Sequence, residues 1–507
     1  MAKLELSPYF DEMYTKGDFP KFKILVDGKW TATKKTQDLI SSTDGKKLAE
    51  IGVADAGDIN RAIESAEKST SKIRSMAAID RIELMLKAME ELETHKDEIA
   101  RALVAESGKA LSSARGEINA AIERMRLSME DSKKIVGEYL PGDWASDTSE
   151  KIALVIREPI GVVLGVSPFN YPVYTSIAKM LPALLAGNTV ILKPPSADPI
   201  AFMMCVEIFR KVGLPTGTLQ VITGSGSETG DLLTSSNKIN MVSFTGSTAV
   251  GKHIASIAGL KKVHMELGGK GNALVLDDAD LELAAKQCVK GSLELAGQRC
   301  DAISRILVVE GVYDKFVTKL KEHMSDFKFG NPLESDAITM GPVISEKAAD
   351  RIDGMVKDAV TKGAKLLAGG KHNAAYYEPT LLVDVPLSAE IANEETFGPV
   401  VTVIKVKDTD DALKVANDSK YGLDSCVFTE NFYNAWEAMK ALQSGNVTLN
   451  AAPSHGTAYF PFGGVKESGY GKEGVGYTID EMTVRKTLIF DLSPKHLGKS
   501  YMGTFKD

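Results

Sequence analysis

Four residues with chemically useful side chains lie where predicted elements of the chain end. Cys300 follows a helical segment and Gly297, and a cysteine thiolate is a strong nucleophile. Glu266 follows an apolar run and precedes two glycines, and a carboxylate that faces a cleft can act as a general base. Asn170 and Lys193 end two further apolar runs, and an asparagine amide can donate to an oxyanion. These are residue types of nucleophilic catalysis, provided that the fold brings them together.

Each of these residues also has an ordinary structural explanation. A cysteine is usually buried and inert, a carboxylate at a strand end can cap a turn, and an asparagine can turn the chain. Arg299 weakens the first explanation, because a neighbouring cation favours the thiolate. The joint position is a stronger signal, since Asn170, Lys193, Gly246 and Glu266 follow consecutive predicted strands. The carboxyl ends of parallel strands meet at one edge of a sheet, where ligands bind.

The elements that position these residues follow a regular alternation. Near-continuous β-branched runs separated by helix-length segments predict a parallel sheet covered on both faces. The runs of this first unit are 160–166, 189–193, 219–223, 241–246, 264–267 and 273–276, and the helices between them are 172–186, 199–212, 227–236 and 248–259. Two long helices, at 81–95 and about 113–135, precede them. The pattern predicts an α/β domain.

A second alternation begins near residue 281 and predicts another α/β domain. Its strands are expected at 303–309, 380–385, 400–406, 425–429 and 446–450, and its helices at 281–295, 313–326, 346–362, 409–418 and 432–443. A hairpin at 139–159 interrupts the first domain, and the tail at 482–492 has the composition of a strand. That tail could pair with the hairpin or with a neighbouring subunit.

The composition excludes several classes of protein. The 507 residues carry 60 basic and 68 acidic side chains, a net charge of −8, which argues against a broad nucleic-acid surface. The four cysteines form no CxxC pair, so we expect neither a disulfide framework nor a thiolate metal site. We find no secretory leader and no apolar run long enough for a membrane span, and we expect a cytoplasmic enzyme without a membrane partner. A standard GxGxxG fingerprint is absent, because the glycines at 224–230 have another spacing.

Seven short motifs nevertheless resemble those of the aldehyde dehydrogenase superfamily, in that family's order. They are SPFNYP (167–172), GNTVILKPP (187–195), FTGS (244–247), MELGGK (265–270), GQRC (297–300), EETFGPV (394–400) and PFGG (461–464). The resemblance implies the aldehyde dehydrogenase fold, with two parallel-sheet α/β domains and a β-arm for oligomerisation. It implies a dinucleotide-binding domain from residues 1–136 and 160–268, a catalytic domain from residues 269–480, and an oligomerisation arm and tail from residues 137–159 and 481–507.

The resemblance also implies roles for individual residues. Cys300 is similar to the family's nucleophile, Glu266 to its general base and Asn170 to its oxyanion donor. The residues similar to those that bind the nicotinamide cofactor are Phe169, Lys193, Ser196, Gly226, Gly246, Ser247, Glu395 and Phe397. NAD-preferring members carry an acid at the position of Ser196, so we expect NADP to be preferred and NAD to be a second cofactor. We expect no metal.

Within this family the chain most resembles the non-phosphorylating glyceraldehyde-3-phosphate dehydrogenases, especially the archaeal ones, through AGQRCDA, PGDW and HGTAYFPFGG. The resemblance implies oxidation of glyceraldehyde 3-phosphate to 3-phosphoglycerate, with Tyr171, Arg299 and His455 at the substrate. Bacterial members carry arginines at the positions of His455 and Ala120. Succinic semialdehyde, lactaldehyde and glyceraldehyde are alternative substrates, and a non-catalytic binding protein on the same scaffold is the alternative class. The family expectation is a homotetramer, a dimer of dimers.

Overall fold

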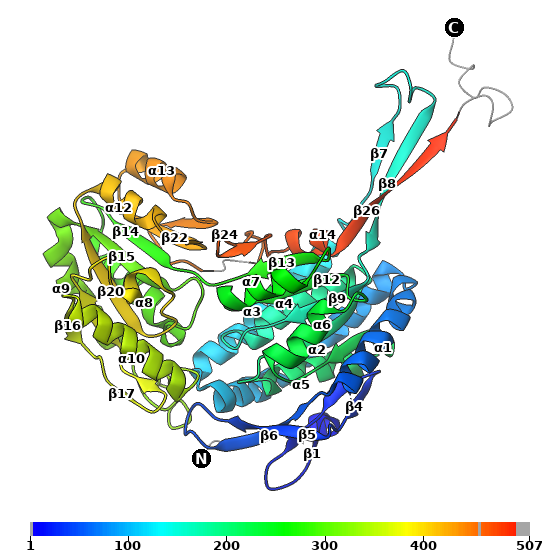
Figure 1. Cartoon of the computed structure of the whole chain (residues 1–507), viewed down its shortest axis with the longest axis horizontal. Helices are drawn as coiled ribbons and strands as arrows, with labels where there is room; N and C mark the ends of the chain where they lie inside the picture. The colour runs from blue at the N-terminus through cyan, green and yellow to red at the C-terminus, as the bar shows by residue number, and fades with distance from the viewer. Residues whose placement is uncertain (1–3, 455–457, 493–507) are drawn as a thin grey trace.

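The first large sheet of the computed structural model, which describes residues 4–454 and 458–492, is mostly parallel (Figure 1). Its strands, in spatial order, are β25 (Gly469–Tyr470), β13 (Lys262–Glu266), β12 (Met241–Thr245), β9 (Val162–Val166), β10 (Thr189–Lys193), β11 (Leu219–Val221), β3 (Ile24–Val26) and β4 (Lys29–Thr31). Neighbours are parallel from β13 to β11, and the pairs that involve β25, β3 and β4 are antiparallel. The predicted parallel sheet is therefore present, with antiparallel strands at both of its sides.

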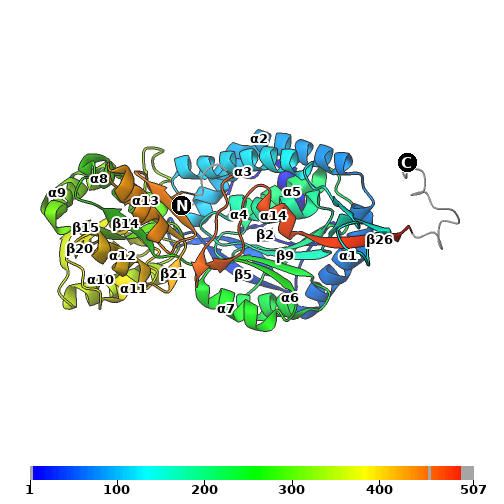
Figure 2. The same cartoon turned by 90° about the horizontal axis from the view of Figure 1, so that it is seen from above.

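Helices cover both faces of this sheet (Figure 2). One face carries α2 (Ala78–Ser107), α3 (Leu111–Ser132), α4 (Pro172–Leu185) and α5 (Ile200–Lys211), and the other carries α1 (Ala56–Arg74), α6 (Asp231–Ser235) and α7 (Thr248–Ile257). Every residue of α4 is buried, because α4 lies between the sheet and the helices α2, α3 and α5. This agrees with its sequence, which is mostly apolar and contains only a few buried polar side chains.

The second large sheet holds the other half of the molecule together. Its strands, in spatial order, are β16 (Lys365–Ala368), β19 (Thr380–Val383), β20 (Val400–Val406), β15 (Ile303–Val309), β14 (Gly271–Val275), β22 (Asp424–Phe428) and β23 (Asn446–Leu449). The associated helices are α8 (Leu281–Leu293), α9 (Tyr313–His323), α10 (Glu346–Thr361), α11 (Glu390–Asn393), α12 (Thr409–Asn417) and α13 (Phe432–Ala441). A separate apolar core packs around this sheet, as expected for a second domain.

A three-stranded antiparallel arm projects from the first domain (Figure 1). It contains β7 (Glu138–Pro141), β8 (Lys151–Pro159) and β26 (Thr483–Asp491), and β26 pairs with β8 along its whole length. The predicted hairpin is thus confirmed, and the tail strand pairs with it within the same chain. The remaining strands are β1 (Tyr14–Thr15), β2 (Lys21–Phe22), β5 (Lys35–Ile40), β6 (Lys47–Val53), β17 (His372–Asn373), β18 (Tyr376–Tyr377), β21 (Tyr421–Gly422) and β24 (Val465–Lys466).

The structure differs from the sequence predictions in three places. The run at 273–276, predicted for the first unit, forms β14 of the second sheet. The chain returns to the first sheet before the predicted domain boundary at residue 480, because β25 pairs with β13 and α14 (Tyr477–Glu481) packs against α4. The helix predicted at 227–236 is split into a π-helical turn, Gly226–Gly230, and the short α6. None of the helices in the described ranges is long and apolar enough to cross a membrane.

Candidate active site

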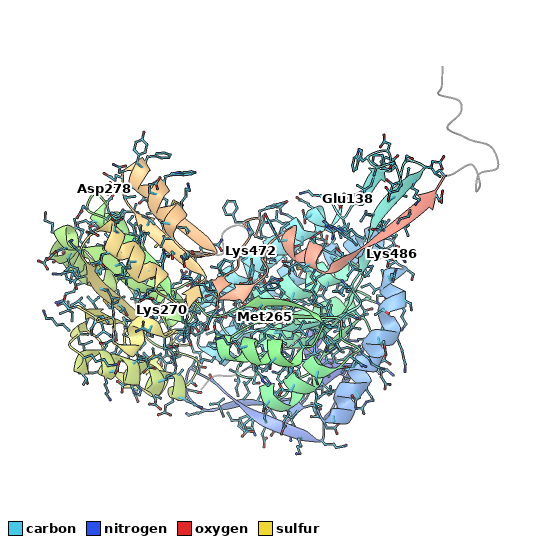
Figure 3. The ribbon with its side chains drawn as sticks, turned by 45° about the horizontal axis from the view of Figure 1, so that its top comes forward. Glu138, Met265, Lys270, Asp278, Lys472 and Lys486 are labelled. Atoms are coloured by element: carbon cyan, nitrogen blue, oxygen red, sulfur yellow. The ribbon has the colours of Figure 1, made fainter. Side chains whose placement is uncertain are left out.

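The predicted site residues of the first domain lie at adjacent strand ends. Lys193 is the last residue of β10 and pairs with Val166 of β9, and Thr245 pairs with Glu266, the last residue of β13. Asn170 follows β9 in the turn before α4. Figure 3 shows Met265 of β13 near Lys270 and Lys472 at the junction of the two large domains, whereas Glu138 and Lys486 lie on the arm. The carboxyl edge of the first sheet therefore faces the second domain.

Cys300 lies at this junction, after a segment with an unusual backbone conformation. Leu295, Ala296 and Gly297 follow α8 with φ values of 56°, 53° and 67°, a left-handed region that costs roughly 1–2 kcal/mol for a residue with a Cβ atom. A Cβ atom on Gly297 would lie 2.1 Å from the carbonyl oxygen of Gly398. Only glycine fits at that position. Cys300 is partly exposed, whereas Cys205, Cys288 and Cys426 are buried.

The two glycines after Glu266 allow this loop to approach the first domain. A Cβ atom on Gly269 would lie 2.2 Å from the carbonyl oxygen of Cys300, and one on Gly268 would lie 2.7 Å from Oε2 of Glu395. The backbone N–H of Gly269 also donates to Oε1 of Glu395, at 3.0 Å. The motif thus brings the segment that carries Glu266 against the segment that carries Cys300.

The surroundings of Cys300 favour the thiol over the thiolate. Burial raises its pKa well above the usual value, and the carboxylates of Asp301, Glu395 and Glu266 raise it further, while Arg299 lowers it. From the sequence we expected Arg299 to favour the thiolate. Its guanidinium donates to Asp301 at 3.0 and 2.9 Å and to Glu294 at 2.8 Å, so most of its charge is compensated. Arg299 therefore lowers the pKa of Cys300, in the direction expected from the sequence, but burial and the nearby carboxylates outweigh this effect.

Asn170 is held in place by residues that no sequence pattern indicated. Its carbonyl oxygen accepts a 2.7 Å hydrogen bond from Lys109, whose ammonium also contacts the buried carboxylate of Glu117. Glu117 accepts from the backbone N–H groups of Val173 and Tyr174 and so caps the N-terminus of α4. The side-chain oxygen of Asn170 accepts from the next backbone N–H, at 3.1 Å.

Two donors expected to bind an oxyanion have no acceptor in the described part of the chain. They are the side-chain amide nitrogen of Asn170 and the backbone N–H of Cys300. Asn170 is only 6% exposed, and its amide nitrogen can donate to a ligand that enters the site. The pair is suited to an oxyanion.

Glu266 is 4% exposed, and neither of its carboxylate oxygens has a hydrogen-bond partner among the described residues. Its nearest cation is His264, whose Nε2 lies 3.3 Å from Oε1 of Glu266 as an ion pair without hydrogen-bond alignment. Burial raises the pKa of Glu266, and the imidazole of His264 lowers it. Gly463, in the PFGG motif, approaches the same carboxylate, because a Cβ atom there would lie 2.7 Å from Oε1. A buried carboxylate with a raised pKa is suited to general-base catalysis.

The residues expected at the cofactor form two groups. Around Lys193, Ser196 is exposed and donates to the carbonyl oxygen of Gly224 at 3.3 Å. Ser247 caps the N-terminus of α7, directly after Gly246. Gly226 is the first residue of the π-helical turn. The second group lies near Cys300, where Phe169 and Phe397 meet edge to face at 5.6 Å and burial raises the pKa of Glu395 to about 7.

The contacts of the Lys193 ammonium group are those expected of a cofactor-binding residue. It is 7% exposed, and its ammonium has one long hydrogen bond among the described residues, to the carbonyl oxygen of Pro194 at 3.5 Å. Burial lowers its pKa to about 8. An ammonium held in this way fits a phosphate or ribose hydroxyl that would complete its hydrogen bonds.

A groove of about 670 Å³ lies against the segment that carries Cys300, since Arg299 and Asp301 line it. It is lined by Tyr171, Arg299 and Asp301, and by Lys290 of α8. Lys290 is exposed and forms neither an ion pair nor a side-chain hydrogen bond with the described residues. Ala120 also lines the groove, which agrees with its alignment to an arginine position. His455 lies outside the described residues.

Arg299 does not offer the open fork of donors that phosphate recognition requires. In addition to its bonds with Asp301 and Glu294, it donates to the carbonyl oxygen of Pro453 at 2.9 Å, and it is 6% exposed. Its role as a direct phosphate ligand, expected from the sequence, therefore conflicts with its contacts. The physical reason is Asp301, which lies two residues away and takes two of the donors.

Four residues of the site were not predicted from the sequence: Lys109, Glu117, His264 and Lys290. No local pattern distinguishes them, because each acts through a partner distant in the sequence or through an open cavity. The remaining charged residues near Glu266 also form long-range contacts: Lys179 lies 3.4 Å from Glu473. Within residues 4–454 and 458–492 no cluster of three or more His, Cys, Asp or Glu residues could hold a metal ion.

Comparison with known proteins gives consistent matches over most of the chain. The sequence profile described as aldehyde dehydrogenase family matches residues 30–488. An NADP-dependent glyceraldehyde-3-phosphate dehydrogenase from Streptococcus equinus is 38% identical over 474 residues, 93% of this chain and 99% of the relative. A 3-sulfolactaldehyde dehydrogenase from Priestia aryabhattai is 37% identical over 472 residues, 93% of this chain and 98% of the relative. Among solved structures, NADP-dependent glyceraldehyde-3-phosphate dehydrogenase from Bacillus halodurans C-125, complexed with NADP, has a TM-score of 0.91 at 38% identity and covers 93% of this chain and 99% of its own.

Proposed function

The chain belongs to the aldehyde dehydrogenase family, as its motifs suggested, and from this we propose that it oxidises an aldehyde to a carboxylic acid through a thioester on Cys300. One observation carries the proposal: a partly exposed cysteine, two oxyanion donors without an acceptor among the described residues and a buried carboxylate meet at one sheet edge. The non-catalytic alternative fits this arrangement poorly, because a binding protein has no need of all three.

The residues divide the chemistry between them. Once its proton is removed, the sulfur of Cys300 adds to the aldehyde carbon, and the resulting oxyanion accepts from Asn170 and from the backbone N–H of Cys300. Removing one such donor typically raises the barrier by about 3–4 kcal/mol. A bound nicotinamide cofactor supplies the hydride acceptor for the oxidation. Glu266 then takes a proton from water, the water oxygen bonds to the acyl carbon, and the carbon–sulfur bond breaks to release the acid and the Cys300 thiolate.

We propose NADP as the preferred cofactor and NAD as a second one. Lys193 and Ser196 would hold the adenosine ribose, because Ser196 leaves room for a 2′-phosphate where an acid would repel it. Gly226, Gly246 and Ser247 lie at turns that would receive the pyrophosphate. Glu395, Phe397 and Phe169 would hold the nicotinamide ribose and ring. The relatives named above support this choice, since two of them are described as NADP-dependent.

We propose glyceraldehyde 3-phosphate as the substrate and 3-phosphoglycerate as the product. The supporting observation is Lys290, a groove cation without a partner among the described residues, with Tyr171 on the same wall. The relatives are named for aldehydes that carry a tetrahedral anion, a phosphate in one and a sulfo group in the other. We propose that Lys290 binds the anionic group of the substrate and that Arg299 shapes the wall of the groove. His455 remains a predicted substrate residue.

The test is kcat/KM for a panel of aldehydes with each cofactor. The panel contains glyceraldehyde 3-phosphate, 3-sulfolactaldehyde, succinic semialdehyde, lactaldehyde and glyceraldehyde. We expect the phosphorylated aldehyde with NADP to give the highest value. A higher value with the sulfonated aldehyde would support the proposed anion-binding site but would contradict glyceraldehyde 3-phosphate as the substrate. A higher value with the uncharged aldehydes would contradict the substrate proposal and leave the thioester chemistry in place.

We also propose that the protein is a homotetramer formed by two dimers. The arm supports this, because its edge strands β7 and β26 leave backbone groups open and its exposed side chains include Tyr139, Trp144 and Ile489, which are 61%, 76% and 69% exposed. An edge of this kind invites association. Light scattering should give four times the mass of one chain, and a monomer would contradict the proposal.

A further inference from the structure

A histidine beside the general base forms a buried ion-pair chain that ends near the surface. We propose that His264, anchored by Glu481, is a positioning residue that supplies the positive charge which holds Glu266 as an anion during release of the acid. This inference rests on the proposed function, in which Glu266 is the base.

The geometry places one imidazole nitrogen at each of two carboxylates. His264 and Glu266 are two residues apart on β13, so their side chains lie on the same face of the strand. Nε2 of His264 lies 3.3 Å from Oε1 of Glu266, and Nδ1 lies 2.5 Å from Oε2 of Glu481, the last residue of α14. The side chains of His264, Glu266 and Glu481 are 1%, 5% and 25% exposed. A protonated imidazole carries an N–H group on both nitrogens, and such a cation suits a position between two carboxylates.

The space around His264 is shaped to this ring. Gly471, with φ of 100°, passes so close that a Cβ atom would lie 2.6 Å from Nδ1 of His264 and 3.0 Å from Oε1 of Glu481. The ring therefore has little freedom to leave the line between the two carboxylates.

Other charged groups face Glu266 but are bound to other partners. Lys179 donates to the hydroxyl of Thr245 at 2.6 Å and faces Glu473, and Arg124 lies 3.6 Å from Glu473. Lys472, next to β25, donates to the carbonyl oxygen of Gly445 at 3.0 Å and to that of Gly463.

Lys262, at the start of β13, contacts the carbonyl oxygen of Glu481. His264 is thus the one cation within ion-pair distance of the Glu266 carboxylate in the described part of the chain.

The pKa shifts of His264 and Glu266 have the directions that this role requires. The two carboxylates overcome the effect of burial and raise the pKa of His264 to about 9, so the ring is cationic near pH 7. In turn, His264 lowers the pKa of Glu266 against the effect of burial. Removing the imidazolium should therefore raise the pKa of Glu266, and a larger share of the base would be protonated at a given pH.

The test separates the two half-reactions of the holoenzyme. We replace His264 by Gln, which removes the charge, and compare it with His253→Gln, a histidine on α7 that is exposed and pairs with Asp231. For each variant we measure the NADPH burst and the post-burst rate between pH 5 and 9. In H264Q we expect the acid limb of the post-burst rate to move up by about one pH unit, a tenfold loss on that limb. The burst should change less than twofold in H264Q, and H253Q should match the parent in both.

Glu481→Gln provides a second variant, which leaves the ring in place and removes its anchor. We expect a smaller shift of the acid limb in the same direction, and this variant decides the matter if H264Q does not fold. An unshifted acid limb in a folded variant overturns the inference, as does an equal loss of burst and post-burst rate. Glu266→Gln distinguishes failure of the proposed function from failure of the inference about His264. Normal turnover in that variant would overturn the proposed function itself. Stalled turnover in E266Q, together with an unshifted acid limb in H264Q, would overturn only the role of His264.

Discussion

The proposed catalytic centre and the groove proposed for the substrate lie side by side, yet they are built in opposite ways. In the centre, Asn170 and Glu266 are 6% and 4% exposed, and glycines such as Gly269 are fixed by contacts under 3 Å that a Cβ atom would make. In the groove, Lys290 is exposed and has no ion-pair or side-chain hydrogen-bond partner among the described residues. The reaction is therefore constrained by many neighbours, and the substrate preference by few.

Arg299 lies between the centre and the groove, and its contacts show to which of the two it belongs. It lines the groove, but Asp301, Glu294 and Pro453 accept from its guanidinium. The contacts of Arg299 make it part of the centre, because removing it would take an ion-pair partner away from two carboxylates. Proximity to the nucleophile is thus a poor guide to which cation meets the substrate.

The largest expected effect comes from the sulfur in the centre. Cys300→Ala should abolish both the NADPH burst and turnover, a loss of at least about 1000-fold, because no other group can form the thioester. Cys288→Ala is the control, since that buried cysteine should keep full activity and lose about 1 kcal/mol of stability. Steady turnover in C300A would refute the assignment of the nucleophile.

Glu266→Gln should separate the two half-reactions. We expect a burst of NADPH near one equivalent per subunit, followed by a rate reduced about 100- to 10,000-fold, because Gln cannot take the proton from water. The shape of Gln preserves the packing against Gly463. Rapid-mixing absorbance measures both phases, and a variant that loses the burst as well would assign Glu266 to deprotonation of Cys300 in addition.

Gly269→Ala tests the close approach between the two domains. Its Cβ atom would meet the carbonyl oxygen of Cys300 at 2.2 Å, and the forced shift should cost roughly 1–3 kcal/mol of stability and about 100-fold in kcat. Gly354→Ala in α10 is the matched control, because nothing lies within 4 Å of the added atom and helix propensity favours alanine. Thermal unfolding and the burst rate would show both effects, and a fully active, stable G269A would contradict the geometry.

The sequence predicted the scaffold well for a physical reason. Buried parallel strands need continuous β-branched runs, so 189–193, 303–309 and 400–406 match β10, β15 and β20. The glycines of the MELGG motif mark positions where two backbones approach closely, and such positions can be recognised in a sequence. The family resemblance then connected these positions to a reaction.

What the sequence could not provide are the partners of charged side chains. Lys109 donates to Asn170 across 61 residues of chain, Glu117 accepts from Val173 across 56, and Glu481 contacts His264 across 217. Periodicity carries no information on such pairs. The neutralisation of Arg299 was missed for a different reason: Asp301 lies only two residues away, but the sequence does not show that the two side chains turn toward each other.

The smallest predicted effect concerns Lys290. It tests the difference between the centre and the groove most directly, because Lys290 lies in the exposed groove. Lys290→Met keeps the length of the side chain and removes its charge, and a hydrogen bond to a charged group is worth about 1.5–3 kcal/mol. We expect KM for glyceraldehyde 3-phosphate to rise about 10- to 100-fold, with kcat and the KM for uncharged glyceraldehyde nearly unchanged. Lys286→Met, one turn earlier on α8 and outside the groove lining, should change neither constant. If K290M and K286M behave alike, the phosphate is held elsewhere and the contrast between groove and centre disappears; if KM rises for both aldehydes equally, Lys290 supports the wall rather than the anion.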